Sequence, residues 1–285
     1  MSRRNKIGLI AVGLGDWVDP YQAENGKISA PLEVTDSITV YDMAVKAEKL
    51  FDAINDDKSK KYVIDVQVEL RKAIRNNLIA FSTMTVLGNC QTSQALALEC
   101  GIFDQEELEP ARLKLVETIR NNNNENACGM LGARNIFHAL TKAGYADLAY
   151  DMIVSENRTG FGSWIKSGET TLCESFIEAD GVVDSRNHHF FGNISSWMIQ
   201  DICGLKPNPN LDDITYVEIS PSFISALSYA NATFKTASGE LNVSWERKDN
   251  AVMIKIQIPK GIRSELKLKG RKSILLKQGE NIIIE

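Results

Sequence analysis

Cysteine and histidine are scarce in this sequence, and neither is arranged as a metal site or a disulfide framework requires. The 285 residues include 5 cysteines and 3 histidines. No two cysteines form a C-x-x-C pair, and their odd number favours reduced, mostly buried thiols over disulfides. Two of the histidines are adjacent and no H-E-x-x-H pattern occurs, so the sequence predicts no metal ion.

Long apolar runs and an excess of positive charge are also missing. The apolar run near the start, residues 7–14, is far shorter than the ~20 residues of a membrane-spanning helix. Asp16 and Trp17 follow it without a small-residue cleavage site, so no signal peptide is expected and a cytoplasmic location is the default. The formal net charge of −5 argues against a general nucleic-acid-binding protein, which needs a basic surface.

Nucleotide-binding and nucleophile motifs are absent as well. There is no P-loop and no G-x-S-x-G turn. Residues 7–15 begin like a dinucleotide fingerprint, with an apolar run followed by Gly13 and Gly15. The third glycine is missing, and Pro20 would interrupt the helix that binds the pyrophosphate. No cofactor is therefore expected.

The period of the apolar residues divides the sequence into a helical part and a strand part. Of the residues, 44% are hydrophobic, which is enough to bury a core. Up to Pro207 the apolar residues recur at helical spacing, and Asp36 precedes the first apolar stripe as an amino-terminal cap. The spacing predicts helices at residues 36–54, 63–81, 92–100, 105–120, 131–143, 146–156 and 187–204.

After Pro207 the apolar residues alternate with polar ones, which is typical of strands with one buried face. A polar turn at residues 248–250 predicts a β-hairpin. Helices followed by strands in separate blocks indicate two domains rather than a βαβ fold. We therefore expect a helical domain at residues 1–206, without any parallel sheet, and an antiparallel β-sandwich at 207–285.

Two irregular segments contain residues suited to sugar chemistry. In the first, Trp17 follows Asp16; an aromatic face and a carboxylate suit a pyranose, but a core tryptophan beside a turn acid has the same pattern. In the second, residues 168–189, several acids lie close to Arg186 and His188. Carboxylates there could activate water while the cations bind hydroxyls, or the segment could be a solvated charged loop. The residues alone leave these alternatives open.

Six motifs in register resemble the carboxyl-terminal part of glycoside hydrolase family 78 α-L-rhamnosidases, and together they cover essentially the whole chain. They are G-L-G-D-W at 13–17, Q-T-S-Q-A-L-A-L at 91–98, G-M-L-G-A-R at 129–134, D-L-A-Y at 147–150, G-E-T-T-L-C-E at 168–174, and S-R-N-H at 185–188 followed by Gly192. The resemblance implies a partial (α/α)6 six-hairpin barrel followed by a β-sandwich.

The resemblance also implies a function, the inverting hydrolysis of terminal α-L-rhamnosides without a cofactor. The glutamate of the family's G-x-T-T-x-x-E motif is the general base, which falls on Glu174. Asp16, Trp17 and His188 match positions that line the rhamnose pocket, and Trp164 lies near another pocket aromatic. If Glu174 is not the base, the candidates are Glu178, Asp180 and Asp184.

The sequence departs from the family pattern at the general acid. In the family this acid precedes the G-D-W segment, but only 12 residues precede Gly13 here and none of them is acidic. We therefore expect slow or no hydrolysis of natural rhamnosides by this chain. The alternative is a non-catalytic carbohydrate-binding or assembly protein of the same fold. Because about half the helices of a twelve-helix barrel are missing, an upstream polypeptide or a homo-oligomer is expected to cover the open face.

Overall fold

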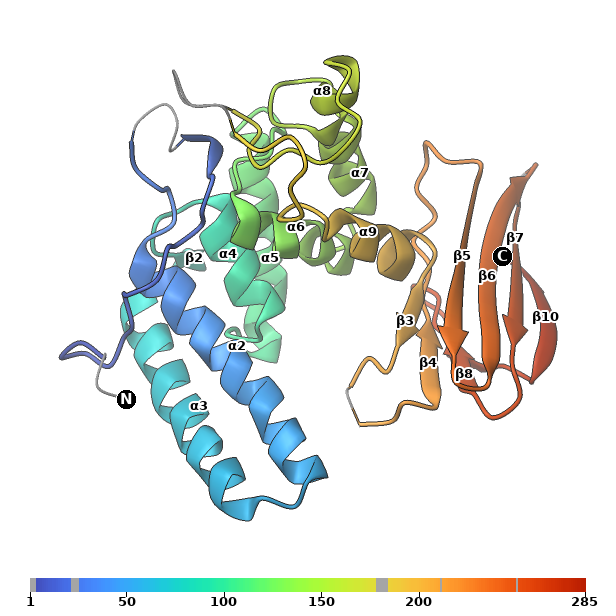
Figure 1. Ribbon diagram of the computed structural model, residues 1–285, viewed down its shortest axis with the longest axis horizontal. Helices are drawn as coiled ribbons and strands as arrows, with labels where there is room; N and C mark the ends of the chain where they lie inside the picture. The colour runs from blue at the N-terminus through green and yellow to red at the C-terminus, as the bar shows by residue number, and fades with distance from the viewer. Residues whose placement is uncertain (1–3, 22–25, 178–183, 211, 250) are drawn as a thin grey trace. The chain divides into compact units, whose positions relative to one another are not determined.

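The chain folds into two compact units, Met1–Asn193 and Ile194–Glu285. The computed structural model, shown in Figure 1, describes residues 4–21, 26–177, 184–210, 212–249 and 251–285. Each unit has its own core, and they are described separately.

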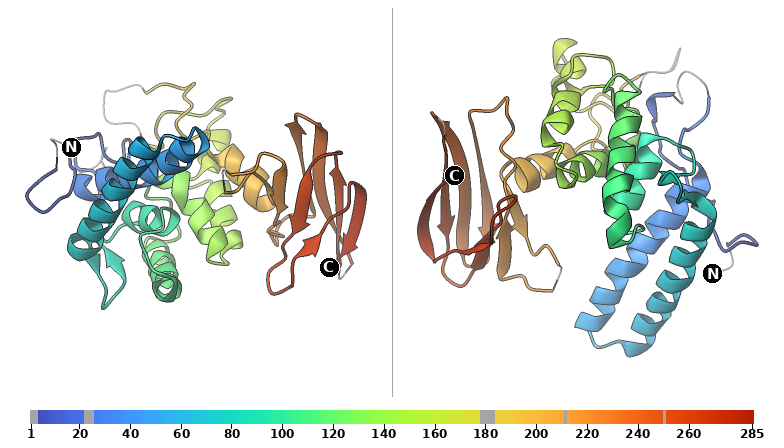
Figure 2. Two further views of the ribbon diagram at one scale, coloured as in Figure 1. Left: turned by 90° about the horizontal axis from the view of Figure 1, so that it is seen from below. Right: turned by 180° about the vertical axis from the view of Figure 1, so that it is seen from behind.

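The first unit is built from consecutive helices that pair through short loops. Its elements are α2 (Leu32–Ala53), α3 (Asp57–Leu78), α4 (Gln91–Glu99), η1 (Gln105–Glu107), α5 (Leu108–Arg120), α6 (Met130–Lys142), α7 (Ala146–Val154) and α8 (Phe161–Lys166). The longest pair, α2 and α3, forms an antiparallel hairpin whose far end projects beyond the other helices of this unit in Figure 1 and in the right view of Figure 2.

The apolar stripe predicted on the second helix forms much of this unit's core. Leu70, Ile74 and Leu78 of α3 are buried, and they pack in one cluster with Val34 and Ile38 of α2. Asp56 caps α3, because its carboxylate accepts a hydrogen bond from the Ser59 N–H at 3.0 Å. The helix prediction for this segment is confirmed.

The predicted cap at Asp36 is wrong. The helix α2 begins four residues earlier, at Leu32, directly after Pro31. Asp36 lies within the helix, and its carboxylate instead accepts hydrogen bonds from the N–H groups of Val12 (2.7 Å) and Gly13 (2.6 Å). A side chain that looked like a local helix signal therefore holds a distant segment.

Three short elements of the first unit were not predicted. The strands β1 (Ile79–Ala80) and β2 (Thr85–Val86) form a small antiparallel hairpin between α3 and α4. The helix α8 lies in the stretch 159–186, which was expected to be irregular. Elements of two to six residues are too short to leave a periodic signal. Among the described residues of the first 200, no parallel strand pair occurs.

The second unit begins with a short helical stretch and continues as two four-stranded sheets. Its elements are α9 (Ile194–Trp197), the π-helical turn η2 (Met198–Ile202), β3 (Leu205–Pro207), β4 (Tyr216–Ile219), β5 (Tyr229–Thr236), β6 (Gly239–Lys248), β7 (Ala251–Ile258), β8 (Arg263–Leu266), β9 (Ile274–Leu275) and β10 (Gly279–Ile284). The sheets have the strand orders β10-β7-β6-β5 and β3-β4-β8-β9.

The expected alternation of buried and exposed residues is present in the long strands. Leu241, Val243 and Trp245 of β6 are buried, and the predicted hairpin pairs Lys248 with Ala251. One expectation is corrected: β4 and β8 pair in parallel, so the sandwich is not purely antiparallel. The period changes near the predicted point, since β3 begins at Leu205. By contacts, however, the unit begins at Ile194, and a domain boundary at 206 and 207 stays a prediction of the sequence.

Candidate functional site

The loops that precede α4, α6 and α8 are joined to one another at one end of the helical unit. Gln91, the first residue of α4, donates from Nε2 to the backbone oxygen of Glu125 in the α5–α6 loop (2.8 Å). Asn157 of the α7–α8 loop donates from Nδ2 to Glu125 Oε1 (3.3 Å). In Figure 1 the part of the amino-terminal segment just before residue 22 and the segment after α8 both lie at the upper end of the helical unit, whereas the part with Arg4 and Ile10 lies by the α2–α3 hairpin. Asp16 and Trp17 lie in the amino-terminal segment, Trp164 lies in α8, and Glu174, Arg186 and His188 lie in the segment after α8.

Asp16 is completely buried at the amino end of α6. Its Oδ1 accepts hydrogen bonds from the N–H groups of Leu131 (2.8 Å) and Gly132 (3.0 Å). Its Oδ2 accepts from the Gly129 N–H (2.8 Å) and from the Thr92 hydroxyl. A carboxylate has about four acceptor positions, so the protein itself uses all of them. Burial raises the pKa of Asp16 to about 6, although the bonds from Thr92, Gly132 and Gly129 oppose that rise.

The capping of α6 links three of the sequence motifs. The first N–H groups of a helix lack partners within it, and the cap residue here, Gly129, has no side chain to supply one. A Cβ at Gly129 would lie 2.3 Å from the backbone oxygen of Trp17, and one at Gly132 would lie 2.1 Å from Thr92 Oγ1. The G-D-W, Q-T-S-Q and G-x-x-G segments therefore interlock around one carboxylate.

Trp17 combines a fixed backbone with an exposed indole. Its backbone oxygen accepts a hydrogen bond from the Met130 N–H of α6 (2.9 Å). Its side chain is 36% exposed, next to a residue that is not exposed at all. Trp17 can therefore present an aromatic surface to a ligand, whereas all four acceptor positions of the Asp16 carboxylate bind donors of the protein itself. A direct contact of Asp16 with a sugar, expected from the sequence, stays a prediction that this geometry does not favour.

Glu174 lies in the first of two chain segments, residues 171–174 and 185–188, that run side by side. Its N–H donates to the Ser185 backbone oxygen (2.8 Å), and its Oε2 accepts from the Ser185 N–H (3.2 Å). The N–H of His188 donates to the Leu172 oxygen (2.8 Å), and the Thr171 hydroxyl donates to the Arg186 oxygen. The side chain is half-buried, and the Ser185 N–H is the donor within hydrogen-bond reach.

The cations expected beside Glu174 have other partners. Arg186 forms an ion pair with Glu169, which sequence reasoning did not single out. The Nδ1 of half-buried His188 accepts a hydrogen bond from the Phe190 N–H (3.3 Å). Neither has a hydrogen bond to Glu174 among those found in the described residues. Their roles in binding hydroxyls stay predictions.

Trp164 is part of an aromatic cluster. Its ring is 8% exposed and stacks on Phe176, with the ring centroids 4.4 Å apart. Phe161 and Phe191 contact it edge-on at 5.3 and 5.8 Å. This packing suffices to explain the tryptophan, and its assignment to the sugar pocket stays a prediction. The cluster also fixes the segment around Glu174, because Phe176 is two residues away.

The alternative acids after Glu174 are only partly described. Glu178 and Asp180 lie outside the described residues, as does most of the stretch 177–183. Asp184 is described, and its carboxylate accepts a hydrogen bond from the Ser175 hydroxyl. In the part of the chain that the structure describes, no group of three metal-ligating side chains occurs. Among those residues, no helix combines the length and apolar character needed to cross a bilayer.

Sequence reasoning missed the buried polar side chains of α4. Gln91, Thr92 and Gln94 are almost inaccessible, and each is hydrogen-bonded to another segment. Gln94, for example, donates to the backbone oxygens of Met84 (2.9 Å) and Ala111 (3.0 Å). The available signal was a run of four polar residues opening an otherwise apolar helix, which suggests polar groups with fixed internal partners.

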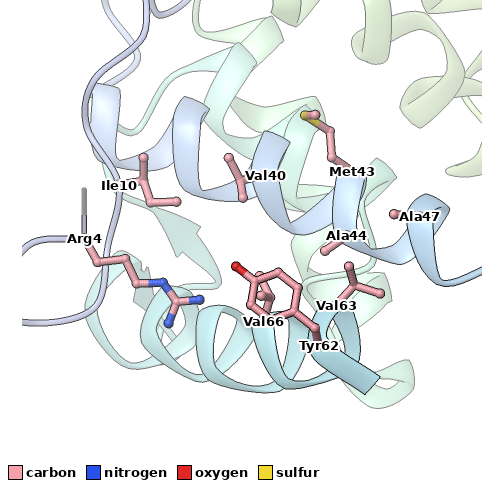
Figure 3. Close-up of a pocket in the computed structure, with 9 residues that line it drawn as sticks. All are labelled: Arg4, Ile10, Val40, Met43, Ala44, Ala47, Tyr62, Val63 and Val66. Carbon is pink, nitrogen blue, oxygen red and sulfur yellow. The ribbon is translucent and has the colours of Figure 1, made fainter. Parts of the chain in front are cut away.

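An apolar groove of about 350 Å³ lies elsewhere in the helical unit, between α2 and α3. Figure 3 shows the side chains that line it: Arg4, Ile10, Val40, Met43, Ala44, Ala47, Tyr62, Val63 and Val66. None of the candidate site residues lines this groove. Met43 is 61% exposed and Tyr62 is 54% exposed, so the groove is open to solvent.

Comparison with known families and proteins gives two matches to family models. Residues 1–202 match the bacterial α-L-rhamnosidase six-hairpin glycosidase domain, and residues 215–282 match the bacterial α-L-rhamnosidase C-terminal domain. An α-L-rhamnosidase of Alteromonas sp. (strain LOR) is 26% identical over 264 residues, which are 88% of this chain and 28% of that protein. The chain thus spans less than a third of the length of this curated relative.

Solved structures show the same fold. The Streptomyces avermitilis α-L-rhamnosidase in complex with L-rhamnose superposes with a TM-score of 0.87 at 21% identity, covering 100% of this chain and 29% of that one. The Aspergillus terreus α-L-rhamnosidase gives a TM-score of 0.89 at 21% identity, covering 99% and 34%. The expected architecture, a six-hairpin glycosidase portion followed by a β domain, is therefore confirmed.

Proposed function

This chain belongs to the bacterial α-L-rhamnosidase six-hairpin glycosidase family, and on that premise we propose that it carries the general-base half of a site that hydrolyses terminal α-L-rhamnosides. The observation that supports this most is the setting of Glu174. Its backbone and one carboxylate oxygen are both tied to Ser185, so the side chain is held. Among the described residues, no hydrogen bond reaches Oε1, which leaves this oxygen able to accept one from water.

The proposed mechanism uses these properties directly. Glu174 takes a proton from a water molecule as that water attacks the anomeric carbon from the face opposite the leaving group. Trp17, exposed at the same end of the helical unit, offers an apolar face to the sugar ring. Holding the base matters because catalysis depends on near-attack geometry. No step requires a cofactor.

The general acid that protonates the leaving oxygen must lie outside residues 1–12. Inverting enzymes need two carboxyl groups about 6.5–9.5 Å apart, one to protonate the leaving oxygen. Residues 1–12, where the family pattern leads toward the acid, contain neither aspartate nor glutamate. A substrate with a good leaving group needs this acid least, because little protonation is required for departure.

The chain is therefore expected to distinguish aryl from alkyl rhamnosides. Turnover of 2,4-dinitrophenyl α-L-rhamnoside should be measurable and should exceed that of methyl α-L-rhamnoside by at least about 10²-fold, the contribution of a general acid. Release of dinitrophenolate and of methanol would be followed with the same protein preparation. Equal rates on both substrates would place a working acid within this chain.

The second candidate function is carbohydrate binding without catalysis, and the exposed indole of Trp17, which can offer an apolar face to a sugar ring, favours it. Calorimetry with L-rhamnose separates the two. Binding of the sugar together with no release of dinitrophenolate supports the binding protein. Release of dinitrophenolate that saturates with substrate supports the enzyme.

We further propose that helices preceding this segment in a complete toroid cover the groove between α2 and α3. Three features support this occupant. The relatives are far longer than this chain, and the groove is apolar and open. Arg4 at its edge pairs with Glu69 through Nη1, but its Nη2 is buried without a hydrogen-bond partner among the described residues. A helix with an apolar stripe and one carboxylate facing Arg4 would satisfy all of these groups.

Replacing Met43 by lysine tests this surface. Met43 is 61% exposed, so the substitution should change the free energy of unfolding by less than about 0.5 kcal/mol. It should reduce binding of an apolar dye and self-association of the isolated chain, both measured on the two proteins at equal concentration. Ile165→Lys, on the exposed side chain of α8 (77% exposed), is the control. Equal reductions by both variants would remove any special role of the groove.

A further inference from the structure

The residue pair Asp16–Trp17 joins a fully buried charge to an exposed aromatic ring. The carboxyl group and the next backbone oxygen together satisfy the N–H groups of residues 129–132 at the start of α6. These donors are more than 110 residues away along the chain. Residues 16 and 17 are thus hydrogen-bonded to the amino end of α6, and the Trp17 indole next to them is exposed.

Besides these hydrogen bonds, the backbone of residues 16–19 packs closely on Gly129 at the start of α6. Gly15 adopts φ +72°, a left-handed conformation that contributes no side chain. The N–H of Asp19 donates to the Asp16 backbone oxygen (3.2 Å), which closes a turn within the segment and leaves α6 uninvolved. The orientation of the indole therefore depends on the carboxyl group beside it.

We propose that Asp16 is a positioning residue for Trp17: its carboxyl group seats residues 16 and 17 on the amino end of α6, and its protonation state sets how firmly the indole is held. The coupling between the two residues stands without any assumed activity. Its consequence for sugar binding rests on the function proposed above.

The surroundings of Asp16 accommodate either protonation state. Thr92 donates to the ionised group, and a hydroxyl can turn to accept from the protonated one. The other titratable groups that act on this site are Cys90 just before α4, Cys128 just before α6, and Asp19 on the same segment.

The direction of the pH effect follows from burial. The seated carboxyl has a pKa of about 6, whereas a carboxyl released to water has its ordinary value near 3.8. The seated form therefore binds a proton more tightly than the released form. The binding of the Asp16 carboxyl group to the amino end of α6 is strongest below pH 4. It weakens as the pH rises to about 6 and is constant above that.

The test uses the protein labelled with 5-fluorotryptophan, whose 4 tryptophans give separate fluorine resonances. The Trp17 resonance is assigned by its loss in Trp17→Phe. In a titration from pH 4.5 to 8 it should move with a midpoint near 6 and broaden at the higher pH. The resonances of Trp197 and Trp245, in the other compact unit, should not follow it. A Trp17 resonance that does not titrate overturns the proposal.

Two variants identify the titrating group. Thr92→Val removes the hydroxyl whose hydrogen bond lowers the pKa of Asp16, so the midpoint should move upward. His188→Gln should leave it in place, which excludes a histidine at the same end. A midpoint that moves with His188→Gln and not with Thr92→Val overturns the assignment. L-rhamnose affinity is measured on the same samples; a titration without any sugar binding supports the coupling and counts against the proposed function.

Discussion

Asp16→Asn is expected to lower the free energy of unfolding of the helical unit by about 1–3 kcal/mol. The four donors around Asp16 all point at acceptor positions. An asparagine offers one oxygen, which can take the place of Oδ1, and its NH2 group would then face Thr92 and the Gly129 N–H. The Thr92 hydroxyl can turn to accept, but the Gly129 N–H is left without a partner, and a buried donor in that state costs about 1–3 kcal/mol. Urea unfolding followed by circular dichroism at 222 nm measures the loss.

Asp36→Asn is the matched control for this prediction. Asp36 also accepts two backbone N–H groups, from Val12 and Gly13, but both reach the same oxygen, Oδ2. The amide oxygen of asparagine can replace it, so the loss should stay below about 1 kcal/mol. Similar losses in the two variants would show that stability does not depend on whether the donors reach one carboxylate oxygen or both.

Glu174→Gln is expected to reduce turnover of 2,4-dinitrophenyl α-L-rhamnoside by about 10²–10⁴-fold, because the amide cannot take a proton from water. The fold should persist, since the amide oxygen can still accept the Ser185 N–H. Binding of L-rhamnose should persist as well, so the loss should appear in kcat rather than in sugar affinity. Both quantities are measured on the same protein.

Glu156→Gln controls for the loss of one negative charge. Glu156 lies in the α7–α8 loop, is exposed, and forms an ion pair with Lys166. Its replacement should leave kcat within about twofold, because surface ion pairs contribute little to stability. An unchanged kcat in Glu174→Gln would remove this residue from the mechanism and make Asp184 the first described alternative.

The long helices and strands were predictable because their periodicity repeats over several turns. The stripe at Leu70, Ile74 and Leu78 is visible in the sequence, and all three are buried. The hairpin of β6 and β7 followed from strict alternation around a polar turn. The short β1–β2 hairpin and α8 leave no such signal. The parallel pairing of β4 with β8 joins strands separated by more than 40 residues, and local pattern does not reveal pairing at that distance.

The candidate site was predictable only where a motif marked it. The resemblance indicated Glu174, and the structure shows it half-buried and bonded to Ser185. The same resemblance suggested a sugar contact for Asp16, yet its four donors come from α4, Gly129 and the first turn of α6. A motif indicates that a residue type is required at a position. It does not show whether that residue binds a ligand or bonds to other parts of the protein. Asp36 shows the same limit for a helix signal.

The anomeric configuration of the first product tests the central claim most directly. Proton NMR during the first minutes of hydrolysis of 2,4-dinitrophenyl α-L-rhamnoside resolves the two anomers before they equilibrate. Water activated by Glu174 on the face opposite the leaving group should give β-L-rhamnose first, and Glu174→Gln should suppress its formation. Initial release of α-L-rhamnose, or equal formation of the β anomer by Glu174→Gln, would contradict the assignment of Glu174 as the base.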